Sequence, residues 1–169
     1  ANTGTNVDLY VLAFNNNGNL TTASSTLKQN LSTYLSQFRT IGDSVAIKDA
    51  FIVNIGVDFE IITLPNFNNN EVLRKCIIAL QNYFNIRNWQ VNEPIIYRDV
   101  FNLLDKIEGV QTIKNVFFTN KTITDGDYSQ YAYDVEGATI NQVLYPSIDP
   151  MVFEVKFLNS DIKGKIVNL

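Results

Sequence analysis

The sequence predicts an α+β fold, a ferredoxin-like βαββαβ two-layer sandwich with an extra helix, followed by an extended C-terminal arm. Apolar residues alternate with polar ones in one long stretch and recur at helical spacing in two others, which predicts two helices on one face of a four-stranded sheet. After residue 120 most of the chain follows neither pattern, which predicts the arm. We therefore expect a ferredoxin-like domain over residues 1–120 and an interface-forming arm with a short strand over residues 121–169.

The first predicted strand and helix cover residues 7–13 and 24–42. The strand alternates apolar and polar side chains and stops at an Asn-Asn-Asn-Gly sequence, which favours a turn. Ser24 or Ser25 can cap the helix, and we expect it to end near Ile41-Gly42. Its apolar residues share one face, which we predict to be core: Leu27, Leu31, Leu35 and Phe38.

Two further strands and a second helix follow. Residues 45–48 predict a short strand, and the regular alternation over residues 51–62 predicts a long, half-buried one that stops at Pro65. Asn70 can cap the second helix, which extends to Phe84. Its predicted core face consists of Leu73, Cys76, Ile77, Leu80 and Phe84.

A short third helix and a fourth strand complete the predicted domain. Apolar residues at helical spacing predict the helix over residues 97–107, and Gly109 stands where a helix often ends in a left-handed residue. Residues 111–119 predict the strand. This order gives the βαββαβ pattern with one helix inserted before its last strand.

The predicted arm carries many apolar side chains without a regular pattern. Its first part is polar, with a turn at residues 125–127, and its middle contains two prolines that prevent regular structure. Residues 151–157 predict one strand. Because an irregular segment cannot cover so much apolar surface, we expect a partner chain to bury it. The predicted interface residues are Tyr131, Tyr133, Val143, Leu144, Tyr145, Pro146, Ile148, Pro150, Met151, Phe153 and Phe157.

Composition excludes several classes of function. The net charge of −4 provides no basic field for nucleic acid or an anionic membrane surface, and no run of about 18 apolar residues predicts a membrane span. The single cysteine, Cys76, excludes an internal disulfide. Since the chain begins without methionine and enters a strand almost at once, we expect it to be part of a longer protein.

The sequence also offers little chemistry, and we expect neither an enzyme nor a cofactor or metal site. It has no histidine, the commonest general base and nitrogen ligand. Cys76 lies in an apolar helical face, which favours core packing over reactivity. Asp58 and Glu60 share one strand face and permit a hydrolase hypothesis, but a solvated face gives the same pattern. The Asp-Gly-Asp at 125–127 lacks the other positions of a calcium loop, and Trp89 is expected to pack over a helix end.

Several segments share the sequence pattern of a known family: residues 40–57 (Thr-Ile-Gly-Asp-Ser through Asn-Ile-Gly-Val), 71–76, 109–112, 138–150 (ending Tyr-Pro-Ser-Ile-Asp-Pro) and 161–164. These segments resemble the baseplate J-like wedge proteins of T4-type contractile-tail phages, and the similarity extends over residues 27–167. The resemblance implies the C-terminal region of a larger wedge subunit that joins copies of itself and neighbouring tail proteins into the ring around the tail hub. It further implies a place in the virion tail baseplate, assembled in the host cytoplasm, and a part in triggering sheath contraction.

Two other hypotheses remain open at this point. Tyr128, Tyr131 and Tyr133 form an aromatic cluster in the sequence, which permits a small-ligand or carbohydrate-binding accessory domain of a tail protein. The alternative reading is that these tyrosines pack within the arm. The hydrolase hypothesis rests on Asp58 and Glu60 alone.

Overall fold

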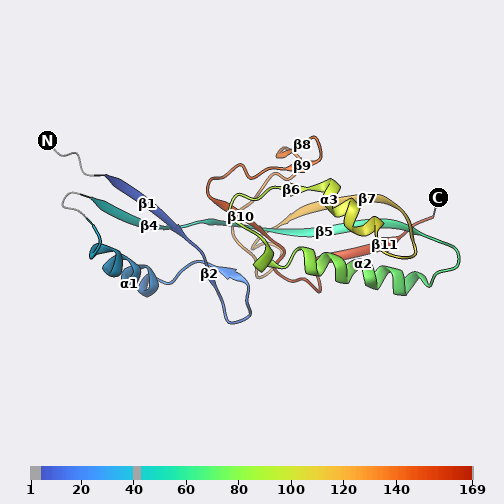
Figure 1. The fold of residues 1–169 in the computed structure, drawn as a ribbon, viewed down its shortest axis with the longest axis horizontal. Coiled ribbons are helices and arrows are strands. Elements are labelled where there is room, and N and C mark those ends of the chain that lie inside the picture. Colours follow the sequence, from blue (N-terminus) through green and yellow to red (C-terminus); the bar gives the residue numbers. More distant parts are fainter. Residues whose placement is uncertain (1–4, 40–42, 169) are drawn as a thin grey trace. The chain divides into compact units, whose positions relative to one another are not determined.

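The computed structural model describes residues 5–39 and 43–168 and divides the chain into two compact units, Ala1–Phe51 and Ile52–Leu169 (Figure 1). This division differs from the expected one at residue 120. The residues on both sides of 120 belong to the second unit because the end of the chain supplies strands to its sheet. No helix in the described part of the chain is long and apolar enough to cross a membrane.

The first unit is a two-stranded parallel sheet with one helix and a small hairpin. Strand β1 (Asn6–Val11) pairs in parallel with β4 (Ser44–Asp49), and β2 (Ala13–Phe14) pairs with β3 (Leu20–Thr21). The hairpin turns at residues 15–18, where Gly18 has a φ of +79° and Asn15 Oδ1 accepts hydrogen bonds from two backbone N–H groups. The turn predicted from the Asn-Asn-Asn-Gly sequence is therefore confirmed.

Helix α1 (Ser25–Ser36) connects the hairpin to β4 and starts as the sequence predicts. The Ser24 side chain accepts a hydrogen bond from the Leu27 N–H at 3.1 Å, which satisfies a donor at the helix start. The helix ends at Ser36, and the predicted end at Ile41-Gly42 lies outside the described residues. No residue of α1 is buried, so its apolar side chains are not the core that we predicted.

The second unit is built around β5 (Phe51–Thr63), the long strand that the alternation predicts. Strand β7 (Val110–Lys121) pairs antiparallel with it over Asn54 to Thr63, and β11 (Ile162–Ile166) pairs in parallel with Val57 to Ile61. Since both neighbours pair with the same residues, they occupy opposite edges of β5. The short β10 (Met151–Glu154) also pairs with β5.

Two helices pack against this sheet (Figure 1). Helix α2 (Asn69–Tyr83) contacts β11, and its N-cap is Asn68, two residues before the predicted cap. Helix α3 (Tyr97–Asp105) contacts β7 and begins at the predicted residue. Their inward side chains form the core together with the sheet: Val72, Cys76, Leu80, Val100 and Leu104 are buried, as are Val53, Ile55, Val57, Phe59 and Ile61 of β5.

Gly164 allows β11 and α2 to pack closely. A Cβ atom at this position would lie 2.3 Å from Phe59 Cζ and 2.6 Å from Leu73 Cδ1, far inside contact distance. The sequence Ile-Lys-Gly-Lys-Ile of β11 therefore places two lysines on one face and a space for α2 on the other.

The segment after residue 120 belongs to this unit and is not an extended arm. Besides β10 and β11, it contributes β8 (Thr139–Ile140) and β9 (Val143–Leu144), which form a small sheet with β6 (Ile95–Ile96). Its apolar side chains are largely covered by the chain itself. We expected a partner to cover them. The sequence could not indicate their cover within the chain, because the pairing of β10 and β11 with a strand about a hundred residues away has no local signal.

The α+β class is confirmed, but the ferredoxin-like arrangement is not. In the predicted sandwich one sheet contains all four strands. In the structure the first two predicted strands pair with each other in the first unit, and the last two pair in the second. A short 3-10 helix (Ile86–Asn88) follows α2.

Candidate functional site

A buried polar network holds the start of the C-terminal segment against β5. Asn54 is 1% exposed; its Nδ2 donates to Glu154 Oε1 at 2.9 Å and its Oδ1 accepts from the Ser129 N–H at 2.7 Å. Asn120 continues the network, because it donates to the Asn54 carbonyl oxygen at 3.0 Å and accepts from the Tyr133 N–H at 2.8 Å. The network thereby joins β5, β7, β10 and the loop after β7.

Asp161 forms a second fixed point in the same unit. Its carboxylate accepts hydrogen bonds from the Tyr128 hydroxyl at 2.6 Å and the Phe157 N–H at 3.0 Å, and its carbonyl oxygen accepts from the Val57 N–H. Burial, and then the bond to Asp161, raise the pKa of the Tyr128 hydroxyl above its ordinary value of 10.0. This tyrosine therefore stays protonated and keeps donating to Asp161 at any physiological pH.

The residues predicted to form an interface divide into two groups. Tyr133, Leu144, Met151 and Phe153 are buried in the second unit's own core. Tyr145 is exposed, and the others are half-buried: Tyr131, Val143, Pro146, Ile148, Pro150 and Phe157. In this conformation only the exposed and half-buried residues present surface to a partner, and their role in an interface remains a prediction.

The Tyr145 region is held in a fixed shape by the side chains of two residues, Tyr133 and Asn92. The Tyr133 hydroxyl donates to the Tyr145 carbonyl oxygen and accepts from the Ser147 N–H at 2.9 Å. Asn92 donates to Asp149 Oδ1 at 2.8 Å, and its Oδ1 accepts from the Met151 N–H at 3.0 Å. The proline-containing segment is therefore a braced loop.

The tyrosines that suggested a carbohydrate platform do not form one. Tyr128 packs edge-on against Phe157 with ring centroids 5.4 Å apart, and Tyr133 packs in the same way against Phe153, also at 5.4 Å. Each hydroxyl is engaged inside the chain, as described above. The geometry of Tyr128 and Tyr133 supports the interpretation that these tyrosines pack within their own segment.

The first unit carries a group of exposed apolar side chains on one helix. On and just after α1, Leu27, Tyr34 and Phe38 are 50%, 58% and 69% exposed, and the Tyr34 and Phe38 rings lie 5.2 Å apart. Together with the half-buried Leu31 and Leu35 they form what we call the α1 face. Among the described residues of this unit, the buried apolar side chains are Leu20, Ala23 and Ala50 alone. The unit therefore has almost no core of its own.

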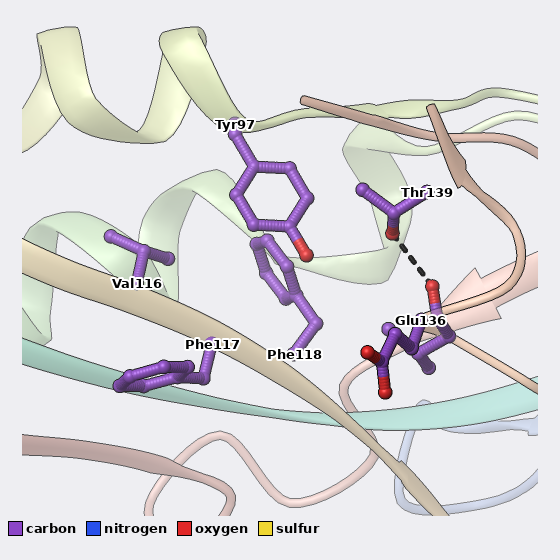
Figure 2. Close-up of a pocket in the computed structure, with 7 residues that line it drawn as sticks. Tyr97, Val116, Phe117, Phe118, Glu136 and Thr139 are labelled. Carbon is purple, nitrogen blue, oxygen red and sulfur yellow. Dashed lines mark hydrogen bonds between the residues drawn. The ribbon is translucent and has the colours of Figure 1, made fainter. Parts of the chain in front are cut away.

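A cavity of about 420 Å³ lies in the second unit between β7, the start of α3 and the loop before β8 (Figure 2). Its walls are Tyr97, Val116, Phe117, Phe118, Val135, Glu136 and Thr139. The Tyr97 and Phe118 rings meet edge to face at 4.8 Å, and the Thr139 hydroxyl donates to the Val135 carbonyl oxygen at 2.6 Å. No local pattern predicts this cavity, because its walls come from three segments that are distant along the chain.

Asp58 and Glu60 lie on one face of β5, as predicted. The parallel register places Lys163 and Lys165 of β11 beside them, and Glu60 Oε2 accepts a hydrogen bond from Asn115 at 2.7 Å. A hollow of about 180 Å³ lies over these residues. The carboxylates are partly exposed among polar neighbours, which is the solvated face that the alternation favours.

The remaining residues singled out in the sequence pack structurally. Cys76 is fully buried, and burial raises the pKa of its thiol from 9.0 to about 11. Trp89 stacks on Phe84 at 5.6 Å and donates to the Tyr83 carbonyl oxygen at the end of α2, as expected. Asp125 accepts a hydrogen bond from the Thr122 N–H within the predicted turn. In the described residues no group of three or more acidic or cysteine side chains could hold a metal ion.

Comparison with solved structures finds a similar fold in a baseplate. A chain in the cryo-electron microscopy structure of the anti-feeding prophage baseplate, determined with sixfold symmetry, superposes with a TM-score of 0.50 at 10% sequence identity. The match covers 79% of this chain and 26% of that chain, so this chain spans about a quarter of its structural neighbour. At this identity the likeness shows a shared fold.

Comparison of sequences adds no relative. No protein-family model matches the chain, and no curated protein matches it at a significant level. The similarity to a baseplate chain therefore rests on structure.

Proposed function

We propose that this chain is a structural part of the baseplate of a contractile tail, and not an enzyme. The observation that carries the proposal is the likeness of 79% of the chain to a prophage baseplate chain. Because the match takes up only 26% of that neighbour, we propose that the present sequence corresponds to one region of a larger subunit. Its partners are other baseplate proteins, and its location is the tail of the particle.

We also propose that the chain associates with copies of itself through its first unit. A two-stranded sheet is marginally stable in water unless something else covers it, and unit Ala1–Phe51 adds a helix without one buried side chain. Burial of the α1 face by a second copy supplies the missing core, at roughly 1.5–3 kcal/mol for each large apolar side chain that becomes fully buried.

The finer assignment follows the sequence resemblance to the J-like wedge proteins of T4-type phages. It makes the chain the C-terminal portion of a wedge subunit that builds the ring around the tail hub and helps to trigger sheath contraction. The firm packing of the C-terminal segment supports a region that transmits force, because its strands are fixed by β5 and by the Asn54 network. Contraction requires two states of the particle. A comparison of assembled baseplates before and after contraction would show whether this region changes between them.

Sedimentation velocity of two matched double variants tests the self-association. Leu27→Lys with Tyr34→Lys places two charges on the α1 face and should leave the chain monomeric. Ile78→Lys with Ile123→Lys adds the same charge to exposed apolar positions of the second unit and should associate like the wild type. A wild-type chain that stays monomeric over the whole concentration range, or equal loss in both variants, contradicts the proposal.

A further inference from the structure

We propose that the cavity lined by Tyr97, Val116 and Phe118 is a binding site for a lysine or arginine side chain presented by a neighbouring protein chain. The inference concerns the second unit alone and stands whether or not the chain belongs to a baseplate. It rests on the shape of the cavity, on its one charged wall residue, Glu136, and on the Tyr97 hydroxyl, which is turned toward the side of the cavity where Glu136 lies (Figure 2).

The floor of the cavity fits the aliphatic stem of a long side chain. Val116, Val135 and the rings of Tyr97 and Phe118 are apolar walls around a volume of about 420 Å³. The methylene groups of lysine and arginine pack on such surfaces while the charged end remains near water. The aromatic faces add attraction for a cation that lies over them.

The charged end of the guest is recognised at the other side of the cavity. Glu136 is the only charged residue of the wall, and none of the lining residues is basic. Its carboxylate has no ion pair or hydrogen bond within the described part of the chain, and it is exposed, so it costs nothing to leave it charged. A cation bound here gains a partner without displacing one.

The Tyr97 hydroxyl supplies a second polar contact. Figure 2 shows it turned toward the side of the cavity where Glu136 and Thr139 lie. The ring is fixed by its edge-to-face contact with Phe118, and the backbone N–H of Tyr97 donates to the Gln142 carbonyl oxygen at 3.0 Å. The hydroxyl oxygen is thus held where it can accept a hydrogen bond from an ammonium or guanidinium group.

A neutral or acidic guest fits this wall less well. An apolar side chain of equal length would leave the Tyr97 hydroxyl unpaired beneath it, and an acidic one would face Glu136 at close range. Charge complementarity therefore selects a basic side chain.

Nuclear magnetic resonance titration of the full chain with blocked tripeptides tests the site. The probes are acetyl-Gly-Xaa-Gly-amide with lysine, arginine, norleucine or glutamate at the centre. We expect saturable shifts of the Tyr97, Val116 and Thr139 signals with lysine and arginine, and at least about tenfold weaker binding of norleucine, whose chain lacks the charge. Absence of saturable shifts, or norleucine binding as tightly as lysine, overturns the proposal.

Three variants locate the recognition. Glu136→Gln keeps the shape of the side chain and should weaken lysine binding about threefold or more, whereas Glu108→Gln, an exposed carboxylate outside the cavity, should leave it unchanged. Tyr97→Phe should also weaken binding while preserving the ring packing. Unchanged spectra outside the cavity verify that each variant is folded. Equal affinities of Glu136→Gln and Glu108→Gln for the lysine peptide would show that the Glu136 carboxylate does not contribute to binding, and would overturn the assignment.

Discussion

At the scale of single residues, Asn54 is the side chain on which the second unit depends most. It lies in the first third of β5, a strand whose other buried residues are apolar, and both ends of its amide are used, toward Glu154 and toward the Ser129 N–H. The alternation in β5 predicts that Asn54 lies on the polar face of the strand. It does not indicate that other parts of the chain cover this face around Asn54. The cover comes from residues about 75 and 100 positions further along the chain.

Replacement of Asn54 by alanine should destabilise the chain strongly. The variant leaves the Ser129 N–H and the Glu154 carboxylate in a buried place with one partner fewer, at a cost of about 1–3 kcal/mol for each group. Urea unfolding followed by circular dichroism measures the loss. Asn102→Ala, at an exposed position of α3, serves as the control and should change stability by less than about 0.5 kcal/mol.

Cys76 should make stability depend on alkaline pH. Its folded-state pKa of about 11 lies above the ordinary value of 9.0, so the folded state holds the proton more tightly than the unfolded state. Its contribution to stability is complete below pH 9 and is lost as the pH rises toward 11. Urea unfolding of wild type and Cys76→Ala between pH 8 and 11 should show a steeper decline in the wild type; parallel declines would contradict the assignment.

At the scale of secondary-structure elements, local patterns predicted most helices and strands but not their pairing. The observed starts of helices α2 and α3 and strands β5 and β7 lie within two residues of the predicted ones. Helix caps and apolar periodicity depend on neighbouring residues in the sequence, so they can be recognised without knowledge of the fold. Strand β11 was missed although Ile162, Gly164 and Ile166 alternate with two lysines. The strand has five residues with a glycine at its centre, so only two apolar side chains mark the alternation, which is too few to predict a strand.

Replacement of Gly164 by alanine should destabilise the packing of β11 against α2. A methyl group at this position must displace Phe59 or Leu73, both of which are packed between β11 and α2, and overpacking of this kind costs about 1–3 kcal/mol. Thermal unfolding of Gly164→Ala should therefore show a lowered Tm. Lys163→Ala, the exposed neighbour in the same strand, should leave the Tm close to that of the wild type, and similar losses in both would argue against a specific contact with α2.

At the scale of the whole molecule, the candidate sites lie where the sequence did not point. Four of the predicted interface residues, among them Leu144 and Met151, fill the core of the second unit, whereas the exposed apolar side chains of Leu27 and Phe38 were predicted to be core. Both reversals have one cause. An apolar pattern predicts that side chains favour burial, but it does not indicate whether their own chain or another chain covers them.

Truncation after Asn120 should unfold the second unit. The shortened chain lacks β10 and β11, so β5 loses two of its three partner strands, and the Asn54 network loses Glu154 and Ser129. Limited proteolysis and hydrogen exchange should show rapid cleavage and no protection of β5. A truncated chain with a sharp unfolding transition would instead restore residues 1–120 as an independent domain.

In the proposed self-association, a second copy of the chain covers the α1 face. Hydroxyl-radical footprinting at low and high protein concentration measures this directly, with oxidation of Tyr34 and Phe38 compared with that of Phe117, which is 50% exposed in the second unit. We expect Tyr34 and Phe38 to become protected as the protein concentration rises, while the oxidation of Phe117 does not change. Equal oxidation of Tyr34 and Phe38 at every concentration would contradict it.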